Sequence, residues 1–303
     1  MHMAMGFRSL LWSLIAFHLV TMVKAGDKTT LLAFKAQASV GVSRTMASWN
    51  GSTHFCSWEG VTCSRRRATT RVIALSLYGS ALTGALSPAL GNLTFLRMLN
   101  LSSNSLHGEI PASLGRLRCL QTLDLSFNSL SGMLPANLSS CVSLTVMALH
   151  SNKLNGLIPA ELGKTLTSLA TMSLWNNSFT GPIPASLSNM SHLQYLDLSN
   201  NQLVGSIPPG LISIQNMQQI YLYANKLSGM LPPLYNLSSL QIFQAGRNML
   251  SGSIPADIGD KLSRIQLLNL GRNQFTGPIP SSLSNLSDLM QLGLGLNKIS
   301  PDF

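Results

Sequence analysis

Side chains that could carry out catalysis are few and far apart in this sequence of 303 residues. Asp124 and Asp197 lie three repeat units apart, roughly 14 Å at the spacing of adjacent strands, which is too far for paired acid–base catalysis on a glycoside. Gly293 and Gly295 belong to a repeat and do not form a phosphate-binding loop. None of the six histidines has the spacing of a metal-ligand set: His2, His18, His54, His107, His150 and His192. The sequence therefore predicts a protein that is not an enzyme and uses no cofactor or metal.

The first 25 residues have the pattern of a secretory signal peptide. Arg8 supplies a basic start, residues 10–20 (LLWSLIAFHLV) form an apolar run, and Val23 and Ala25 are the small residues of a cleavage site. We expect cleavage after Ala25; the alternative, an uncleaved anchor, requires an apolar run of about 18 residues or more. No second membrane span is expected in residues 26–303. The chain is thus predicted to enter the secretory pathway and to reach the cell surface, on the extracellular side of the plasma membrane, or the apoplast.

Secretion gives meaning to cysteine pairs and to asparagine sequons. Cys56 and Cys63 lie close together beside a tryptophan, and we predict a structural disulfide between them. Cys141 falls at a core place of the repeat described next, equivalent to Leu117, which favours a buried free thiol over a bridge to Cys119. N-glycosylation is expected at eight Asn-x-Ser/Thr sequons: Asn50, Asn92, Asn100, Asn137, Asn176, Asn189, Asn236 and Asn285.

A repeat of about two dozen residues must position all of these groups. Its copies begin, at spacings of 23 to 25 residues, at Val72, Leu96, Leu120, Leu144, Leu169, Leu193, Met217, Leu240, Ile265 and Leu289. This is the period of a leucine-rich repeat. Apolar residues at the first, fourth and sixth places should point into the core and the residues between them outward, because side chains alternate along a strand. The predicted fold is an α/β repeat solenoid, a right-handed leucine-rich repeat superhelix with a concave parallel β-sheet, whose stacked coils bury the core.

Asparagine and glycine hold fixed places in each copy. Asparagine takes the ninth place from Asn104 to Asn297, and Ser80 replaces it in the first copy. Its amide can satisfy backbone groups as a buried ladder, although asparagine is also a common turn former. Glycine at the thirteenth place, from Gly84 to Gly277, allows backbone angles closed to other residues, and the Ile-Pro that follows fixes an extended bend.

Outward places of the copies bring aromatic and arginine side chains onto the predicted concave face. Such residues are frequent interface anchors, and arginine can hold an acidic side chain or a terminal carboxylate. The candidate ligand-binding residues are Phe127, His150, Trp175, Tyr195, Tyr221, Tyr223, Arg247 and Arg272. Strand propensity is the alternative explanation for the aromatic residues. A glycan on Asn176 would crowd this patch, and no carboxylate is expected beside His150.

Residues 26–71 are predicted to cap the apolar end of the first coil. Asp27 is expected to cap a helix in which Leu31, Phe34 and Ala38 share one face. The predicted organisation is therefore a signal peptide in residues 1–25, an amino-terminal cap in residues 26–71, and about ten repeats in residues 72–303, the last of them incomplete.

Several of these segments resemble a known family. The motif D-x-x-x-L-L-A-F-K at residues 27–35, the pair Trp49-Asn50, and C-x-W-x-G-V-x-C at residues 56–63 resemble the plant-type amino-terminal cap of leucine-rich repeat proteins. The repeat L-x-x-L-x-L-x-x-N-x-L-x-G-x-I-P-x-x-L resembles the plant-specific class. Residues 86–117, LSPALGNLTFLRMLNLSSNSLHGEIPASLGRL, look especially like cell-surface receptor kinases of innate immunity.

The resemblance implies the extracellular domain of a plant receptor kinase-like protein that perceives a peptide or a microbial molecule in defence or development. Such proteins bind ligands on the inner face and often recruit a smaller co-receptor kinase. This sequence departs from the pattern after its tenth copy, where Pro301 interrupts the repeat, and it shows no cysteine cap, membrane span or kinase motif beyond it. Membrane association is therefore expected only through a missing carboxy-terminal region or an uncleaved signal.

The net charge of the chain indicates which classes of partner it could bind. Lysine and arginine exceed aspartate and glutamate by ten, and the balance is near +8 once the signal peptide is removed. An alternative is therefore a secreted binder of acidic cell-wall components, resembling the polygalacturonase-inhibiting proteins. The basic residues are scattered apart from Arg65, Arg66 and Arg67, without interleaved aromatics, so nucleic acid is not expected. The expected ligand is a peptide, a protein or a carbohydrate.

Overall fold

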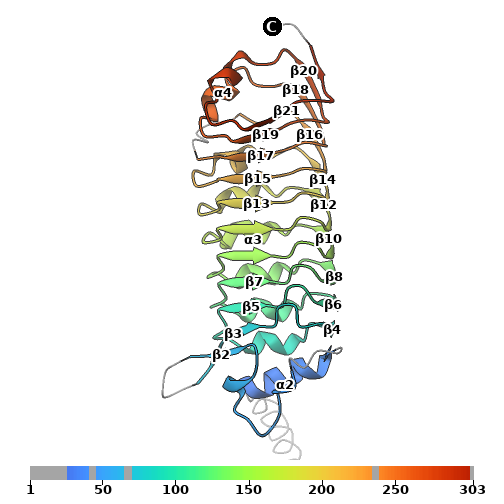
Figure 1. The fold of residues 1–303 in the computed structure, drawn as a ribbon, viewed down its shortest axis with the longest axis vertical. Helices are drawn as coiled ribbons and strands as arrows, with labels where there is room; N and C mark the ends of the chain where they lie inside the picture. Colours follow the sequence, from blue (N-terminus) through green and yellow to red (C-terminus); the bar gives the residue numbers. More distant parts are fainter. Residues whose placement is uncertain (1–25, 41–45, 65–69, 234–238, 301–303) are drawn as a thin grey trace, which may run out of the picture.

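A computed structural model describes residues 26–40, 46–64, 70–233 and 239–300. The chain winds into stacked coils, and two sheets of eleven strands run along the stack from the cap to the last coil (Figure 1). The predicted leucine-rich repeat solenoid with a parallel sheet is confirmed. The predicted signal peptide, the arginines at 65–67 and the sequon at Asn236 lie outside the described residues.

The concave sheet holds the third to fifth places of each repeat. Its strands are β2 (Val61–Cys63), β3 (Val72–Ser76), β5 (Met98–Asn100), β7 (Thr122–Asp124), β9 (Val146–Ala148), β11 (Thr171–Ser173), β13 (Tyr195–Asp197), β15 (Gln219–Tyr221), β17 (Ile242–Gln244), β19 (Leu267–Asn269) and β21 (Gln291–Gly293). Leu99 pairs with Leu123 and Asn100 with Asp124, so equivalent places lie side by side in parallel register. The central leucine is fully buried at both positions, while the residues beside it face outward.

A second sheet, which the sequence reading missed, runs along the stack beside the first. Its strands are β1 (Ala38–Val40), β4 (Leu82–Ala85), β6 (Ser105–Gly108), β8 (Ser129–Met133), β10 (Lys153–Leu157), β12 (Ser178–Pro182), β14 (Gln202–Gly205), β16 (Lys226–Gly229), β18 (Met249–Ser253), β20 (Gln274–Gly277) and β22 (Lys298–Ile299). In most of these strands a single buried leucine or phenylalanine lies between less buried neighbours, as Leu106, Leu130 and Phe179 do. That short alternation is the signal that could have predicted it.

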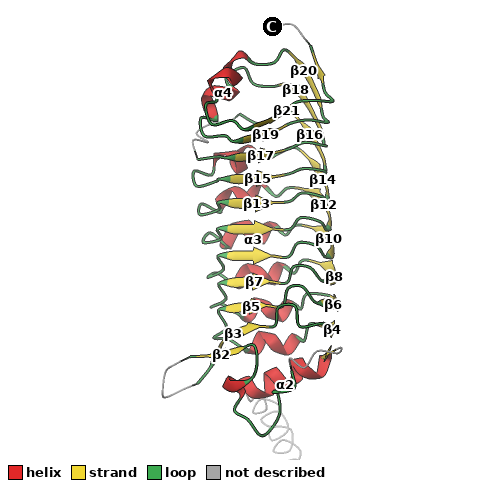
Figure 2. Cartoon of the chain, viewed as in Figure 1, coloured by secondary structure: helices red, strands yellow, loops and turns green. Residues whose placement is uncertain are grey.

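Short helices close the coils behind the concave sheet (Figure 2). Apart from the cap helix α2 (Asp27–Gln37), they are η1 (Phe55–Ser57), η2 (Pro88–Asn92), η3 (Ala112–Arg116), η4 (Ala136–Ser140), α3 (Ala160–Thr165), η5 (Ala185–Asn189), η6 (Pro209–Ser213), α4 (Ile258–Lys261) and η7 (Ser281–Asn285). Several begin directly after the proline of the Ile-Pro pair, as η3 does after Pro111.

The asparagine ladder is confirmed by its hydrogen bonds. Asn128 donates from Nδ2 to the carbonyl of Leu101 in the preceding coil at 3.0 Å and to the carbonyl of Leu125 in its own coil at 3.1 Å. Its Oδ1 accepts from the backbone N–H of Leu106 at 2.9 Å. One side chain thus satisfies backbone groups in two coils that no strand pairing reaches.

A left-handed turn follows each strand of the concave sheet, at the eighth place of the repeat. The non-glycine residues in this conformation, with φ between 51° and 59°, are Ser103, Phe127, Ser151, Asn176, Asn200, Ala224, Arg247, Arg272 and Leu296. Backbone hydrogen bonds to the next coil hold the turn, for example from Phe127 N–H to the His150 carbonyl at 3.0 Å. The stacking therefore imposes a conformation that these residue types rarely adopt alone.

The cap adds one antiparallel strand to the first edge of each sheet. β1 pairs with β4 and β2 pairs with β3, which covers both edges. Leu31 and Phe34 are buried on one face of α2 as predicted, whereas Ala38 is buried but lies in β1, because the helix ends at Gln37. Cys141 is a buried free thiol while Cys119 is exposed. Burial raises the pKa of Cys141 to about 11.

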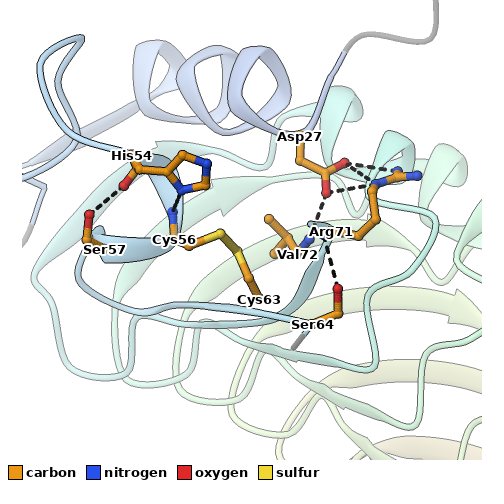
Figure 3. Close-up of a disulfide and its surroundings, with 8 residues drawn as sticks. All are labelled: Asp27, His54, Cys56, Ser57, Cys63, Ser64, Arg71 and Val72. Atoms are coloured by element: carbon orange, nitrogen blue, oxygen red, sulfur yellow. Dashed lines mark hydrogen bonds and ion pairs between the residues drawn. A yellow bond between two sulfur atoms is a disulfide. The ribbon is translucent and has the colours of Figure 1, made fainter. Parts of the chain in front are cut away.

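The predicted disulfide between Cys56 and Cys63 is present, but the role expected for Asp27 was wrong (Figure 3). Gly26 precedes the helix, and Asp27 is its first residue. The Asp27 carboxylate instead forms an ion pair with Arg71 at 3.0 Å and accepts from the N–H of Val72 at 2.7 Å. It therefore joins the cap to the first repeat, because Arg71 and Val72 lie where the two meet.

Candidate functional site

The eight candidate residues lie on or directly after strands of the concave sheet. Tyr195 and Tyr221 belong to β13 and β15, while the others follow strands at the seventh or the left-handed eighth place. The structure divides them into an aromatic cluster, a tyrosine pair and an arginine-lined recess, and Arg247 is exposed and joins none of these. Whether they bind a ligand remains a prediction.

Phe127, His150 and Trp175 form the aromatic cluster, contributed by three consecutive coils. The rings of His150 and Trp175 stack at 5.0 Å with 15° between their planes, and Phe127 meets His150 edge-on at 4.9 Å. Phe127 is 50% exposed, and the other two are half-buried. These contacts fix the rings before any ligand arrives, which lowers the entropic cost of using them as a binding surface.

Two carboxylates act on His150, contrary to our expectation. Burial lowers the pKa of His150 below its usual range, and the negative charges of Asp124 and Asp197 oppose that effect. Both aspartates sit at the fifth place of their repeats, Asp124 on β7, the strand next to β9, and Asp197 on β13, two strands from β9. The expectation considered only residues directly beside His150, whereas Coulomb interactions extend diagonally and across more than one coil. The Nδ1 atom of His150 is buried and has no hydrogen-bond partner.

Tyr195 and Tyr221 pair on adjacent strands, with ring centroids 5.5 Å apart. The Tyr195 hydroxyl donates to Oδ2 of Asp197 at 3.2 Å, and the N–H of Ser199 donates to Oδ1 at 2.9 Å. Asp197 is only 8% exposed. Burial raises its pKa above the usual range, although its hydrogen bonds and the His150 charge act in the opposite direction. Burial and the Asp197 charge raise the pKa of both tyrosines.

Tyr223 and Arg272 line an open recess of about 290 Å³ towards the carboxy-terminal coils. Asn269, Gly271, Gly295 and Leu296 complete its walls. The glycines at the seventh place leave the strand backbone accessible there, so a flat or extended ligand could approach closely. The sequence did not predict this recess, although it predicted Tyr223 and Arg272 as ligand-binding residues. The other lining residues occupy places of the repeat where the sequence showed no sign of a site.

The sequons differ in their exposure. Asn50, Asn137, Asn176, Asn189 and Asn285 are exposed, whereas Asn92 and Asn100 are partly buried. Four of these side chains already form hydrogen bonds: Asn50 with the Ser52 hydroxyl at 2.6 Å, Asn100 with the Ser102 hydroxyl at 2.7 Å, Asn176 with the Ser151 hydroxyl at 3.2 Å, and Asn285 with Asp260 at 2.7 Å. Asn176 directly follows Trp175, so a glycan there would lie next to the aromatic cluster. Glycosylation at each site remains a prediction.

Among the described residues, no set of three or more histidine, cysteine, aspartate or glutamate side chains is arranged to hold a metal ion. No helix within the same residues has the length and apolar character needed to cross a membrane.

Known proteins share both the cap and the repeats. The leucine rich repeat N-terminal domain matches residues 24–64, and leucine rich repeats match residues 95–117, 119–141, 142–203, 167–227 and 264–286. Together these matches cover more than half of the chain. The LRR receptor-like serine/threonine-protein kinase EFR of Arabidopsis thaliana is 56% identical over 77 residues, which are 25% of this chain and 7% of EFR.

Solved structures of plant receptors have the same fold. The LRR ectodomain of the membrane receptor kinase GASSHO1/SCHENGEN3 from Arabidopsis thaliana superimposes with a TM-score of 0.79 at 34% identity, covering 90% of this chain and 36% of that one. The plant peptide hormone receptor RGFR1 gives a TM-score of 0.68 at 38% identity, covering 72% and 34%. The matched regions thus span only a minor part of these relatives. With its capped amino terminus and plant-type repeats, the chain belongs to the leucine-rich repeat proteins, and its homologues include the ectodomains of plant receptor-like kinases.

Proposed function

We propose that this chain is an extracellular ligand-binding domain of a plant receptor kinase-like protein, one that perceives a peptide or a microbial molecule in defence or development. It acts by binding and catalyses no reaction. The observation that carries the proposal is the aromatic and arginine surface on the concave sheet, from Phe127 to Arg272. Half-exposed aromatic rings in fixed contacts are the usual anchors of protein interfaces.

The solved relatives support a peptide as the ligand class. The GASSHO1 ectodomain was solved in complex with CASPARIAN STRIP INTEGRITY FACTOR 2, and the peptide hormone receptor RGFR1 in complex with RGF2. Concave glycines beside Arg272 suit an extended backbone with an acidic group. A co-receptor kinase would then join the complex, and the chain would act at the cell surface or in the apoplast.

A displayed library of random dodecapeptides, selected on the purified chain, tests this proposal. Trp175→Ala and Tyr223→Ala should each weaken the selected peptides by about 2 kcal/mol, roughly 30-fold. Met133→Ala is the matched control, because Met133 is 69% exposed on the second sheet. Peptides that lose affinity only with Met133→Ala would refute the proposal.

The alternative function, a secreted binder of acidic cell-wall components, rests on the net charge of +10. Polygalacturonate is the direct probe. Binding that falls steeply with salt and is unaffected by Trp175→Ala would favour this alternative, because scattered surface charge is screened by ions and does not depend on one aromatic anchor.

A further inference from the structure

We propose that the part of the concave sheet between Asp124 and Asp197 is a subsite for a cationic side chain, a lysine or an arginine, of the bound peptide. The proposal deepens the proposed function and rests on it. It assigns a charge to the ligand at coils three to six and a role to two aspartates outside the aromatic and arginine surface.

The floor of this subsite is a row of fifth-place residues. Strand pairing sets Asp124 beside Ala148, Ala148 beside Ser173, and Ser173 beside Asp197. A carboxylate therefore stands at each end of the row, and the two side chains between them are small. The row spans three strand spacings, roughly 14 Å, so one cationic group can contact the more exposed Asp124 while Asp197, which is buried, attracts it through space.

The wall of the subsite is the aromatic cluster. His150 and Trp175 each follow a small floor residue by two positions along the chain, so they stand beside the floor on the same face of the sheet. Their stacked rings lie 5.0 Å apart. Aromatic faces, tryptophan above all, attract lysine and arginine. Carboxylates and an aromatic face together thus provide both elements of cation recognition.

Neither negative charge forms an ion pair with a lysine or an arginine of the described residues, and burial favours the neutral form of the nearby His150. Among the described residues the one ion pair joins Arg71 to Asp27, in the cap. The partners of Asp124 and Asp197 are neutral: the hydroxyl and N–H of Ser126 for the former, and Ser199 and Tyr195 for the latter. Uncompensated carboxylates on a chain with a net charge of +10 are costly for folding and favourable for binding a cation.

Folding does not explain why residue 124 is charged. Oδ1 of Asp124 accepts from the N–H of Ser126 at 3.0 Å and from its hydroxyl at 2.6 Å. One coil earlier, Asn100 makes the same two bonds to Ser102 at 3.0 Å and 2.7 Å. A neutral asparagine at the fifth place therefore accepts the same two hydrogen bonds as the aspartate does. The charge of Asp124 is available for a ligand, and Asp124→Asn should keep the fold.

The dodecapeptide selection also tests this subsite. Peptides that depend on Trp175 should be enriched in lysine or arginine, and Asp124→Asn should weaken each of them about tenfold, the usual effect of one charge-assisted hydrogen bond. Asp197→Asn should weaken them less, because Asp197 is 8% exposed and acts on the cation through space. Replacing the peptide arginine by neutral citrulline should remove most of that sensitivity, a coupling that a purely structural effect would not show. Glu161→Gln, an exposed acid on helix α3, is the charge-matched control.

The outcomes separate the subsite from the wider function. Selected peptides that need Trp175 but lack basic residues, or that bind the Asp→Asn variants unchanged, would overturn the subsite and leave the proposed function standing. Peptides indifferent to both Trp175 and Tyr223 would overturn the proposed function and the subsite together. Equal losses for Glu161→Gln and Asp124→Asn would also overturn the subsite, because they would reflect net charge alone.

Discussion

At the scale of single residues, His150 is the most unusual side chain of the concave sheet. It stacks on Trp175, lies within reach of Asp124 and Asp197, and keeps a buried Nδ1 atom without a partner. Burial dominates over the two negative charges, so the neutral form of the ring is the favoured one in the folded chain. Protonation must therefore work against folding.

The free energy of unfolding should therefore decrease in mild acid because of His150. The folded pKa of His150 lies below the ordinary value of 6.5, so the unfolded chain takes up the proton first as the pH drops through 6.5 and below. Well above pH 6.5, where His150 is neutral in both the folded and the unfolded chain, its contribution to the free energy of unfolding does not change with pH. Urea unfolding at pH 7.5 and pH 5.5 should show a larger loss for the natural chain than for His150→Gln. Equal losses would mean that the two aspartates cancel the effect of burial, and a smaller loss for the natural chain would mean that they outweigh it.

The sequence predicted the state of a single residue correctly where local spacing or its place in the repeat determines that state. The pairing of Cys56 with Cys63 and the burial of Cys141 followed from spacing and from a place in the repeat. The role of Asp27 did not, because its partner Arg71 lies 44 residues away, and no local pattern encodes that contact. The missed carboxylates near His150 have the same cause, since they come from other coils.

At the scale of elements, the asparagine ladder holds adjacent coils together. Asn128→Ala would remove a side chain that serves the carbonyls of Leu101 and Leu125 and the N–H of Leu106. We expect a loss of about 3 kcal/mol in the free energy of unfolding, because buried backbone groups are left without partners. Chemical denaturation measures it. Asn155→Ala is the control, since Asn155 is exposed on β10, and comparable losses for the two would contradict the ladder.

Elements were predicted unevenly from the sequence. Apolar residues at the first, fourth and sixth places predicted a clear strand in every coil, whereas most strands of the second sheet show a single buried leucine or phenylalanine, as at Leu106 and Phe179. The left-handed turn at the eighth place could not be predicted from the sequence, for another reason. Phenylalanine, arginine and alanine all occur there, so residue type carries no signal, and the backbone angle comes from hydrogen bonds to the next coil.

At the scale of the whole molecule, the solenoid is held together by contacts between successive coils. The cap covers its first end through β1 and β2, and the disulfide closes a short loop that carries β2. The repeat length and its apolar pattern predicted the solenoid and its concave sheet, but not the second sheet. The boundaries at residues 25 and 71 remain predictions, because the repeat pattern fixes the start of a coil but not the limits of what precedes it.

Removing the disulfide should therefore loosen one end of the molecule only. The double change Cys56→Ser and Cys63→Ser should cost on the order of 2 kcal/mol in the cap, since a short closed loop is released. Hydrogen exchange should accelerate in β2 and β3 and stay unchanged in β17 and β19. Faster exchange along the entire stack would show that the coils unfold as one unit.

The eighth-place turn has a consequence for how such a surface can diversify. Serine, phenylalanine, asparagine, alanine, arginine and leucine all sit there within a few degrees of one another. Neighbouring coils enforce the backbone, so exchanging one of these side chains for another alters what the surface presents while the scaffold stays constant. Mutation of the eighth-place residues can thus produce new binding specificities at little risk to folding. A library randomised at these positions would vary the binding surface while the fold stays nearly unchanged.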